Sequence, residues 1–201
     1  MNMLDDTRSP LRTIVSLAWP AALAALFHES YAFVDMFWVS WLGKEAIAAV
    51  ALTGIVLWAV MALSQVFATG VQALVARAHG ADQRTRADQA LHDGLIASLV
   101  TGILATIPLS IYPVEILSLL GAKAPVAALG APYLRLMALA VPALIASITL
   151  GSAFRGAGDM ITPLAFVGAS AMTNMVLDPI LIFGAGPIPP LGLAGAALVV
   201  R

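Results

Sequence analysis

Long stretches without any charged residue are the feature that most constrains this sequence. Residues 46–76 contain no Asp, Glu, Lys or Arg over 31 positions, and similar stretches cover residues 94–114, 136–154 and 179–200. A helix needs about 20 apolar residues to cross the hydrocarbon core of a bilayer. The chain is 61% hydrophobic and 10% charged, whereas soluble domains are about 45–50% apolar and about 25% charged. We therefore predict an all-α integral membrane protein.

Two further apolar stretches contain embedded acids. Residues 13–43 include Glu29 and Asp35, and residues 160–184 include Asp178. Glycine and proline clusters separate the stretches, which predicts short connections and antiparallel packing of successive helices. Because the last apolar stretch stops at Arg201, we expect a partial chain. The expected architecture is one membrane lobe over residues 1–201, with helices at about 11–41, 45–78, 87–112, 125–155 and 162–183 and an incomplete sixth helix at 193–201.

The distribution of Lys and Arg predicts the orientation of the helices. Cytoplasmic segments of membrane proteins carry an excess of these residues. With the N-terminus inside, the cytoplasmic segments hold six of them and the outer loops hold two: Arg8, Arg12, Arg77, Arg84, Arg86 and Arg155 against Lys44 and Lys123. We therefore expect a multi-pass protein of the plasma (inner) membrane with a cytoplasmic N-terminus.

Composition argues against several classes of function. The net charge is −1, which does not favour nucleic acid as a partner. The chain has no cysteine, so disulfides and thiolate metal sites are excluded. The three histidines, His28, His79 and His92, are scattered, and no set of nucleophile, base and orienting residue is evident. We expect neither an enzyme nor a cofactor.

Acidic residues inside the apolar stretches are the candidate functional groups. A charged side chain at the centre of a membrane helix costs about 2.5–3.5 kcal/mol, so it usually faces the bundle interior. Asp35 follows Tyr31 by four residues, and Asp178 follows Asn174 by four residues. Residues four apart share a face of a helix. Each of the two helices therefore offers a carboxylate and a neutral hydrogen-bonding partner one turn earlier.

This set of oxygen ligands suits a coupling cation. Two carboxylates, an amide and a phenol would bind Na⁺, and Pro179 frees the carbonyl of Met175 as a further ligand. The set also suits H⁺, because two nearby acids in a dry bundle cannot both ionise without a large cost. If the cation is Na⁺, Asp35 and Asp178 are the expected metal ligands. The alternative is that both acids only hold helices together by hydrogen bonds.

Three other polar or helix-breaking positions have two interpretations each. His28 lies on the same helical stripe as Asp35, where it is either a buried neutral residue or a functional one. Arg135 lies inside the fourth predicted helix, where it either extends to the outer surface or pairs with an acid. Pro20 lies about four turns before Asp35, where it is either a static kink or a hinge.

Several segments resemble the N-terminal half of a MATE (multidrug and toxic compound extrusion) transporter, nearest the DinF-like branch. The most specific are "YAFVDMFWVSWLGKEAIAAVAL", "FRGAGDMITPL" and "TNMVLDPILIFGAGP". They stand in the order of the family with "AWPAAL", "GVQALVARAHGA", "APYLRLMAL" and "PLGLAGAAL", and together they cover nearly the whole chain. The dipeptide at His28 and Glu29 departs from the expected pattern.

The resemblance implies a transporter of twelve helices in two six-helix lobes, of which this chain covers the first. It implies export of small organic, often cationic, compounds driven by inward H⁺ or Na⁺. It also implies a cation site formed by Tyr31, Asp35, Asn174 and Asp178, and a first helix that bends at Pro20. The lobe missing from this chain would complete the substrate path.

Two alternatives remain open from the sequence. A flippase for lipids or polysaccharide precursors would belong to the same wider superfamily, although Arg135 is nearly the only cation inside the predicted spans. A non-transporting membrane protein, in which the acids only fix packing, is the other alternative. The substrate, the choice between H⁺ and Na⁺, and the oligomeric state do not follow from the sequence.

Overall fold

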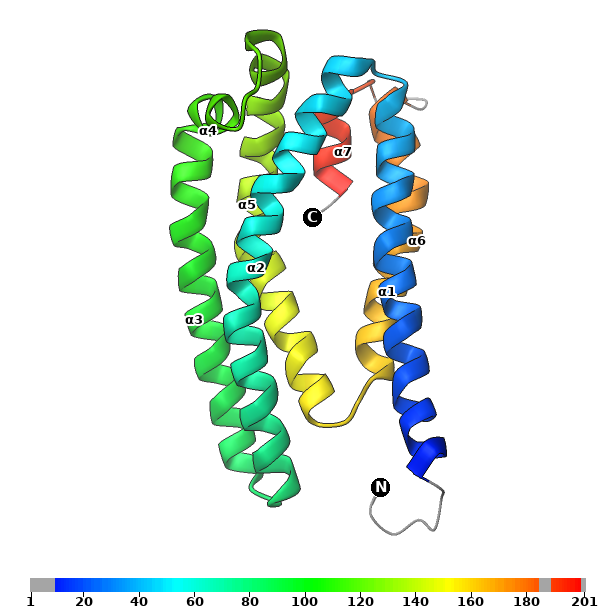
Figure 1. Ribbon diagram of the computed structural model, residues 1–201, viewed down its shortest axis with the longest axis vertical. Helices are drawn as coiled ribbons and strands as arrows, with labels where there is room; N and C mark the ends of the chain where they lie inside the picture. The colour runs from blue at the N-terminus through cyan, green and yellow to red at the C-terminus, as the bar shows by residue number, and fades with distance from the viewer. Residues whose placement is uncertain (1–9, 185–188, 200–201) are drawn as a thin grey trace.

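The computed structural model describes residues 10–184 and 189–199, and within these residues it is made of helices, with no strand (Figure 1). Five long helices run beside one another along the long axis of the molecule, joined by short turns. The seven helices are α1 (Pro10–Ser40), α2 (Lys44–Gly80), α3 (Arg84–Ile111), α4 (Pro113–Leu119), α5 (Ala124–Gly156), α6 (Ile161–Phe183) and α7 (Leu193–Val199).

Four of the described helices are long and apolar enough to cross a membrane, namely α2, α3, α5 and α6. The helix α1 has 31 residues, which at 1.5 Å per residue gives a length of about 46 Å, also enough for a bilayer. The described residues thus form a bundle of membrane-length helices, as the apolar stretches predict.

The short helix α4 is the element that the sequence analysis did not predict. It begins immediately after Tyr112, and its first residue, Pro113, suits the first position of a helix because that position needs no N–H partner. Glu115 lies in the first turn, where the helix dipole favours a negative charge. Seven residues are too few to produce a helical pattern in the sequence.

The helices form two groups. The helices α2 and α3 both pack along α5, whereas α1 packs mainly against α6. In Figure 1, α1 and α6 stand together at one side, and α7 lies between this pair and the upper part of α5. The pair is parallel, because Phe27 lies beside Gly168 near one end and Trp38 contacts Phe183 near the other. Contacts of this pair with α2 and α5 are sparse.

A proline and a glycine set the close contact between α3 and α5. A side chain at Gly102 would place its Cβ 2.5 Å from the Cα of Pro142, so only glycine allows this approach. Pro142 has no N–H, which leaves the carbonyl of Ala138 without its donor inside α5. The hydroxyl of Thr106 on α3 lies 2.8 Å from that carbonyl and donates to it. A side chain of α3 thus supplies the donor that Pro142 cannot provide within α5.

The turn between α5 and α6 is held by Asp159. Its Oδ1 accepts hydrogen bonds from the backbone N–H groups of Ile161 and Thr162, at 3.0 and 2.9 Å, and its Oδ2 accepts one from the Thr162 hydroxyl at 2.6 Å. These bonds satisfy donors at the start of α6 that have no partner inside the helix. They also hold the pKa of Asp159 below its usual value, mainly through the Thr162 side chain and backbone.

We predict that Thr106→Val destabilises the protein by about 1–3 kcal/mol, because a buried carbonyl loses its donor. Thermal unfolding of the purified protein in detergent measures the effect. Thr106→Ser keeps the hydroxyl and serves as the control, with a smaller loss. Equal stability of the Val variant and the wild type would contradict this account of Pro142.

We predict that Asp159→Ala lowers the thermal midpoint near pH 7 by about 2–4 °C, because α6 loses its cap. Since the folded pKa is lowered, the stabilisation is present above the unfolded pKa of about 3.9 and disappears as the pH falls through the folded value. The difference between variant and wild type should therefore shrink in acid. A difference that stays constant from pH 7 to acid would refute the role of the carboxylate charge.

Candidate cation site

The two membrane acids lie at the same level of the lobe. Asp35 is five residues before Ser40, the last residue of α1, and Asp178 is five residues before Phe183, the last residue of α6. Because α1 and α6 are parallel neighbours, both acids lie about 7.5 Å from the same end of the pair.

The side chains of Asp35, Asn174 and Asp178 are buried. The relative exposure is 8% for Asp35, 2% for Asn174 and 0% for Asp178. The Nδ2 of Asn174 donates to the Oδ1 of Asp178 at 3.1 Å, as expected for residues one turn apart. The structure therefore joins Asn174 to Asp178 by a hydrogen bond and places Asp35 at the same level of the neighbouring helix.

Three oxygen atoms of this group accept no hydrogen bond from any described residue. They are the Oδ1 of Asp35, the Oδ1 of Asn174 and the Oδ2 of Asp178. A buried acceptor without a donor costs free energy, more so when it is charged. Carboxylate and amide oxygens are ligands of hard cations, and a carboxylate also takes a proton. The arrangement thus fits either Na⁺ or H⁺.

Apolar residues surround the acids. Val39 and Ile182 each follow one of the acids by one turn, and both belong to a buried cluster with Val50 and Met137 from α2 and α5. The rings of Trp38 and Phe183 meet edge to face, 5.9 Å apart. In such surroundings two uncompensated negative charges are expensive, and a cation between them is strongly attracted.

The remaining candidate residues of this region all belong to α1. Pro20 lies inside α1 and is buried, 15 residues before Asp35, and the helix continues through it. Tyr31 is part of α1, but its side chain lies outside the described residues. His28 and Glu29 are exposed, so the interpretation of His28 as a buried neutral residue was wrong.

Arg135 does not pair with an acid in the structure. It is exposed, and its Nε donates to the carbonyl of Ser110 at 3.1 Å. Ser110 lies in the last turn of α3, where carbonyls lack helical partners and cations are favoured.

Among the described residues, no cluster of three or more His, Cys, Asp or Glu side chains could hold a metal ion.

The sequence analysis missed Trp38. Its indole N–H is buried and has no hydrogen-bond partner among the described residues, although it stands only three residues after Asp35. In the sequence it is one of several aromatic residues in an apolar stretch. Only packing against Phe183 reveals that its polar atom is enclosed.

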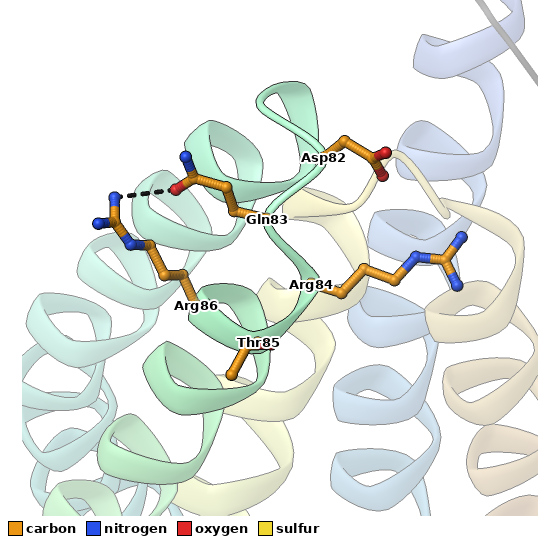
Figure 2. Close-up of a pocket in the computed structure, with 5 residues that line it drawn as sticks. All are labelled: Asp82, Gln83, Arg84, Thr85 and Arg86. Atoms are coloured by element: carbon orange, nitrogen blue, oxygen red, sulfur yellow. Dashed lines mark hydrogen bonds between the residues drawn. The ribbon is translucent and has the colours of Figure 1, made fainter.

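Of two hollows in the surface of the described residues, one lies far from the acids and the other lies beside them. A pocket of about 540 Å³ is lined by Asp82, Gln83, Arg84, Thr85 and Arg86 at the turn from α2 to α3 (Figure 2). All five residues are exposed, and Arg86 donates to Gln83 at 2.9 Å while Arg84 points away from them. A second, apolar groove of about 550 Å³ lies on the α1–α6 pair and is lined by Phe33, Val34, Phe37, Trp38 and Met175.

Comparison with known proteins shows which family the chain resembles. Residues 20–180 match the family MatE. The chain is 28% identical over 187 residues to an FAD transporter of Shewanella oneidensis, covering 93% of this chain and 41% of that protein. It is 28% identical over 197 residues to the multidrug export protein MepA of Staphylococcus aureus, covering 95% and 42%.

A solved structure gives the same result. The crystal structure of a MATE in the bent conformation superposes with a TM-score of 0.86 at 29% identity, covering 96% of this chain and 42% of that one. The chain thus spans less than half of the length of the proteins it matches.

We predict that Asp35→Asn leaves the thermal midpoint unchanged or raises it by about 2–4 °C, because a buried carboxylate without a donor is removed. Asn174→Leu, which removes the hydrogen bond between Asn174 and Asp178, should instead lower the midpoint. Thermal unfolding in detergent compares the two variants. If the acids only glue helices together, Asp35→Asn should be the destabilising change.

Proposed function

The chain belongs to the MatE family, and from this premise we propose that it forms the N-terminal lobe of a cation-coupled antiporter that exports organic compounds. One observation carries the proposal. Two carboxylates from helices far apart in the sequence lie at one level of an apolar interface, with three buried oxygens that accept no hydrogen bond from a described residue. Such a site favours a cation over any neutral ligand.

The coupling ion is H⁺ or Na⁺, and Asp35 is its principal ligand. Within the described part of the chain, the Oδ1 of Asp35 has no hydrogen-bond partner, whereas Asp178 is already held by Asn174. A cation that enters between the acids would complete their coordination and pull α1 towards α6. Tyr31, one turn before Asp35, would add its hydroxyl. If the ion is Na⁺, Asp35 and Asp178 are its charged ligands, with the amide oxygen of Asn174 as a neutral one.

Coupling requires that cation and substrate favour different conformations of the lobe. The α1–α6 pair has few contacts with α2 and α5, so it can move against the α2–α3–α5 group at a modest cost. Pro20 makes α1 easier to bend, because it removes a backbone hydrogen bond inside the helix. Cation binding at Asp35 would bias this bend and lower the affinity for the exported compound.

The exported compounds are proposed to be small, mostly cationic, organic molecules. Relatives named for multidrug export support this, and so does the negative charge of the site, which disfavours anions nearby. The protein would act in the plasma (inner) membrane with its N-terminus in the cytoplasm, since the Arg-rich turn from α2 to α3 then faces inward. The exchange would need the second lobe of the family fold.

Export of a flavin nucleotide is the second candidate. It is favoured by the similarity to the FAD transporter of Shewanella oneidensis, which is as strong in identity as the similarity to MepA. An anionic nucleotide would have to bind away from Asp35 and Asp178. Measurement of FAD and of cationic dyes in the medium of cells with and without the gene distinguishes the two candidates.

We predict that Asp35→Asn in the complete protein reduces cation-driven export of a cationic dye about tenfold or more. The physical reason is that the variant can no longer gain and lose a positive charge at this position. Dye efflux from cells, with and without an imposed gradient of H⁺ or Na⁺, measures the effect.

Asp159→Asn, outside the membrane helices, is the matched control for the loss of one negative charge. Export that stays unchanged in Asp35→Asn, with the same dependence on the gradient, would remove Asp35 from the mechanism.

A further inference from the structure

We propose that the indole N–H of Trp38 is the donor that replaces the coupling cation on Asp35. In the cation-free state the indole N–H donates a hydrogen bond to the carboxylate of Asp35. In the cation-bound state this hydrogen bond is broken. Trp38 is therefore a positioning residue for cation exchange. The role in exchange rests on the proposed function, whereas the hydrogen bond itself does not.

The first support is the position of the two side chains. Trp38 follows Asp35 by three residues in α1, so the two side chains are neighbours on the helix surface. Aromatic side chains in helices lean towards the N-terminus, over the residues three and four positions earlier. This tendency directs the indole of Trp38 towards Asp35 and Val34, and the ring lines the apolar groove together with Val34.

The second support is that both polar atoms are buried and unpartnered. The Nε1 of Trp38 and the Oδ1 of Asp35 have no hydrogen-bond partner among the described residues. A buried donor without a partner costs about 1–3 kcal/mol, and an unpaired acceptor on a charged group costs more. A donor and an acceptor that are both orphaned, one helical turn apart, can relieve each other by a small side-chain rotation.

The third support is that the surroundings of the ring allow such a rotation. On one side the ring is backed by Phe183, with ring centroids 5.9 Å apart, and it also contacts Phe37 at 5.1 Å. On the other side it borders the groove of about 550 Å³. The ring therefore has a firm support and free space next to it.

No other charged group competes for this role. Of the elements packed against α1, α6 contributes only Asp178, and the described part of α7 has no charged residue. On α2, Lys44 and Glu45 lie at the outer turn with side chains 90% and 44% exposed, and Arg77 and His79 lie at the opposite end. The N–H of Trp38 is a buried donor without a partner among the described residues, three positions after Asp35 on the same helix.

The indole N–H and the cation compete for the carboxylate of Asp35, and this competition allows the cation to leave. A donor that waits beside Asp35 lowers the cost of losing the cation, because the charge left behind gains a hydrogen bond at once. Without this donor the cation should be held more tightly and released more slowly. A variant without the N–H should therefore combine a higher apparent cation affinity with a lower maximal rate.

The hydrogen bond can be tested directly by NMR of the complete protein with ¹⁵N-labelled tryptophan, in alkaline buffer without Na⁺. The Trp38 indole signal is identified as the one that disappears in Trp38→Phe. In Asp35→Leu we expect this proton signal to move upfield and its exchange with deuterium to accelerate about tenfold. The signal of Trp41, which is exposed, should not change. A Trp38 signal that is insensitive to Asp35→Leu would overturn the proposal.

Measurement of transport by the complete protein provides the second test. Trp38→Phe should lower the half-saturating concentration of the driving cation about tenfold and also lower the maximal export rate. Trp41→Phe is the matched control and should change neither value. A lower rate with an unchanged half-saturating concentration would indicate a structural role and sink the proposal. If Trp38→Phe does not fold, benzothienylalanine at position 38 keeps the ring shape and removes the N–H.

The two tests separate the two claims. If the wild type shows no export driven by H⁺ or Na⁺, the proposed function is wrong, but the NMR signal still decides whether Trp38 bonds to Asp35.

Discussion

The pairing of α1 with α6 is the contact on which the candidate site depends. It brings Asp35 and Asp178, 143 positions apart in the chain, to one level and encloses them among Val39, Ile182 and Phe183. Burial makes an ionised carboxylate costly, and the proposed cation would offset this cost. A site of this kind is built by placing costly groups where one ligand relieves the cost.

The remainder of the lobe provides a firm support for this pair. The helices α2 and α3 pack closely on α5 through Gly102 and Pro142, and the hydroxyl of Thr106 satisfies the carbonyl that Pro142 leaves free. By contrast, contacts between the pair and this group are sparse. A well-packed group beside a loosely attached pair is an arrangement in which one part can move as a unit.

Predictability from the sequence varied with the range of the interactions. The uncharged stretches were sufficient to predict an all-helical membrane protein, and the spacing of Asn174 and Asp178 predicted their hydrogen bond, because both depend on one helix at a time. The helix α4, the partner of Arg135 and the buried N–H of Trp38 were not predicted. Each of these depends on which elements meet, and no local pattern carries that information.

The sequence by itself determined that the chain lies in a membrane and that α1 and α6 each carry an acid on one face. Hydrophobicity and helical periodicity act over one or two turns, so the residues themselves specify these features. Only the tertiary structure decided that the two acids share an interface and that His28 and Glu29 remain exposed. It also decided that the indole N–H of Trp38 is buried without a partner among the described residues. These features arise from packing between distant segments, where many side chains together select one arrangement.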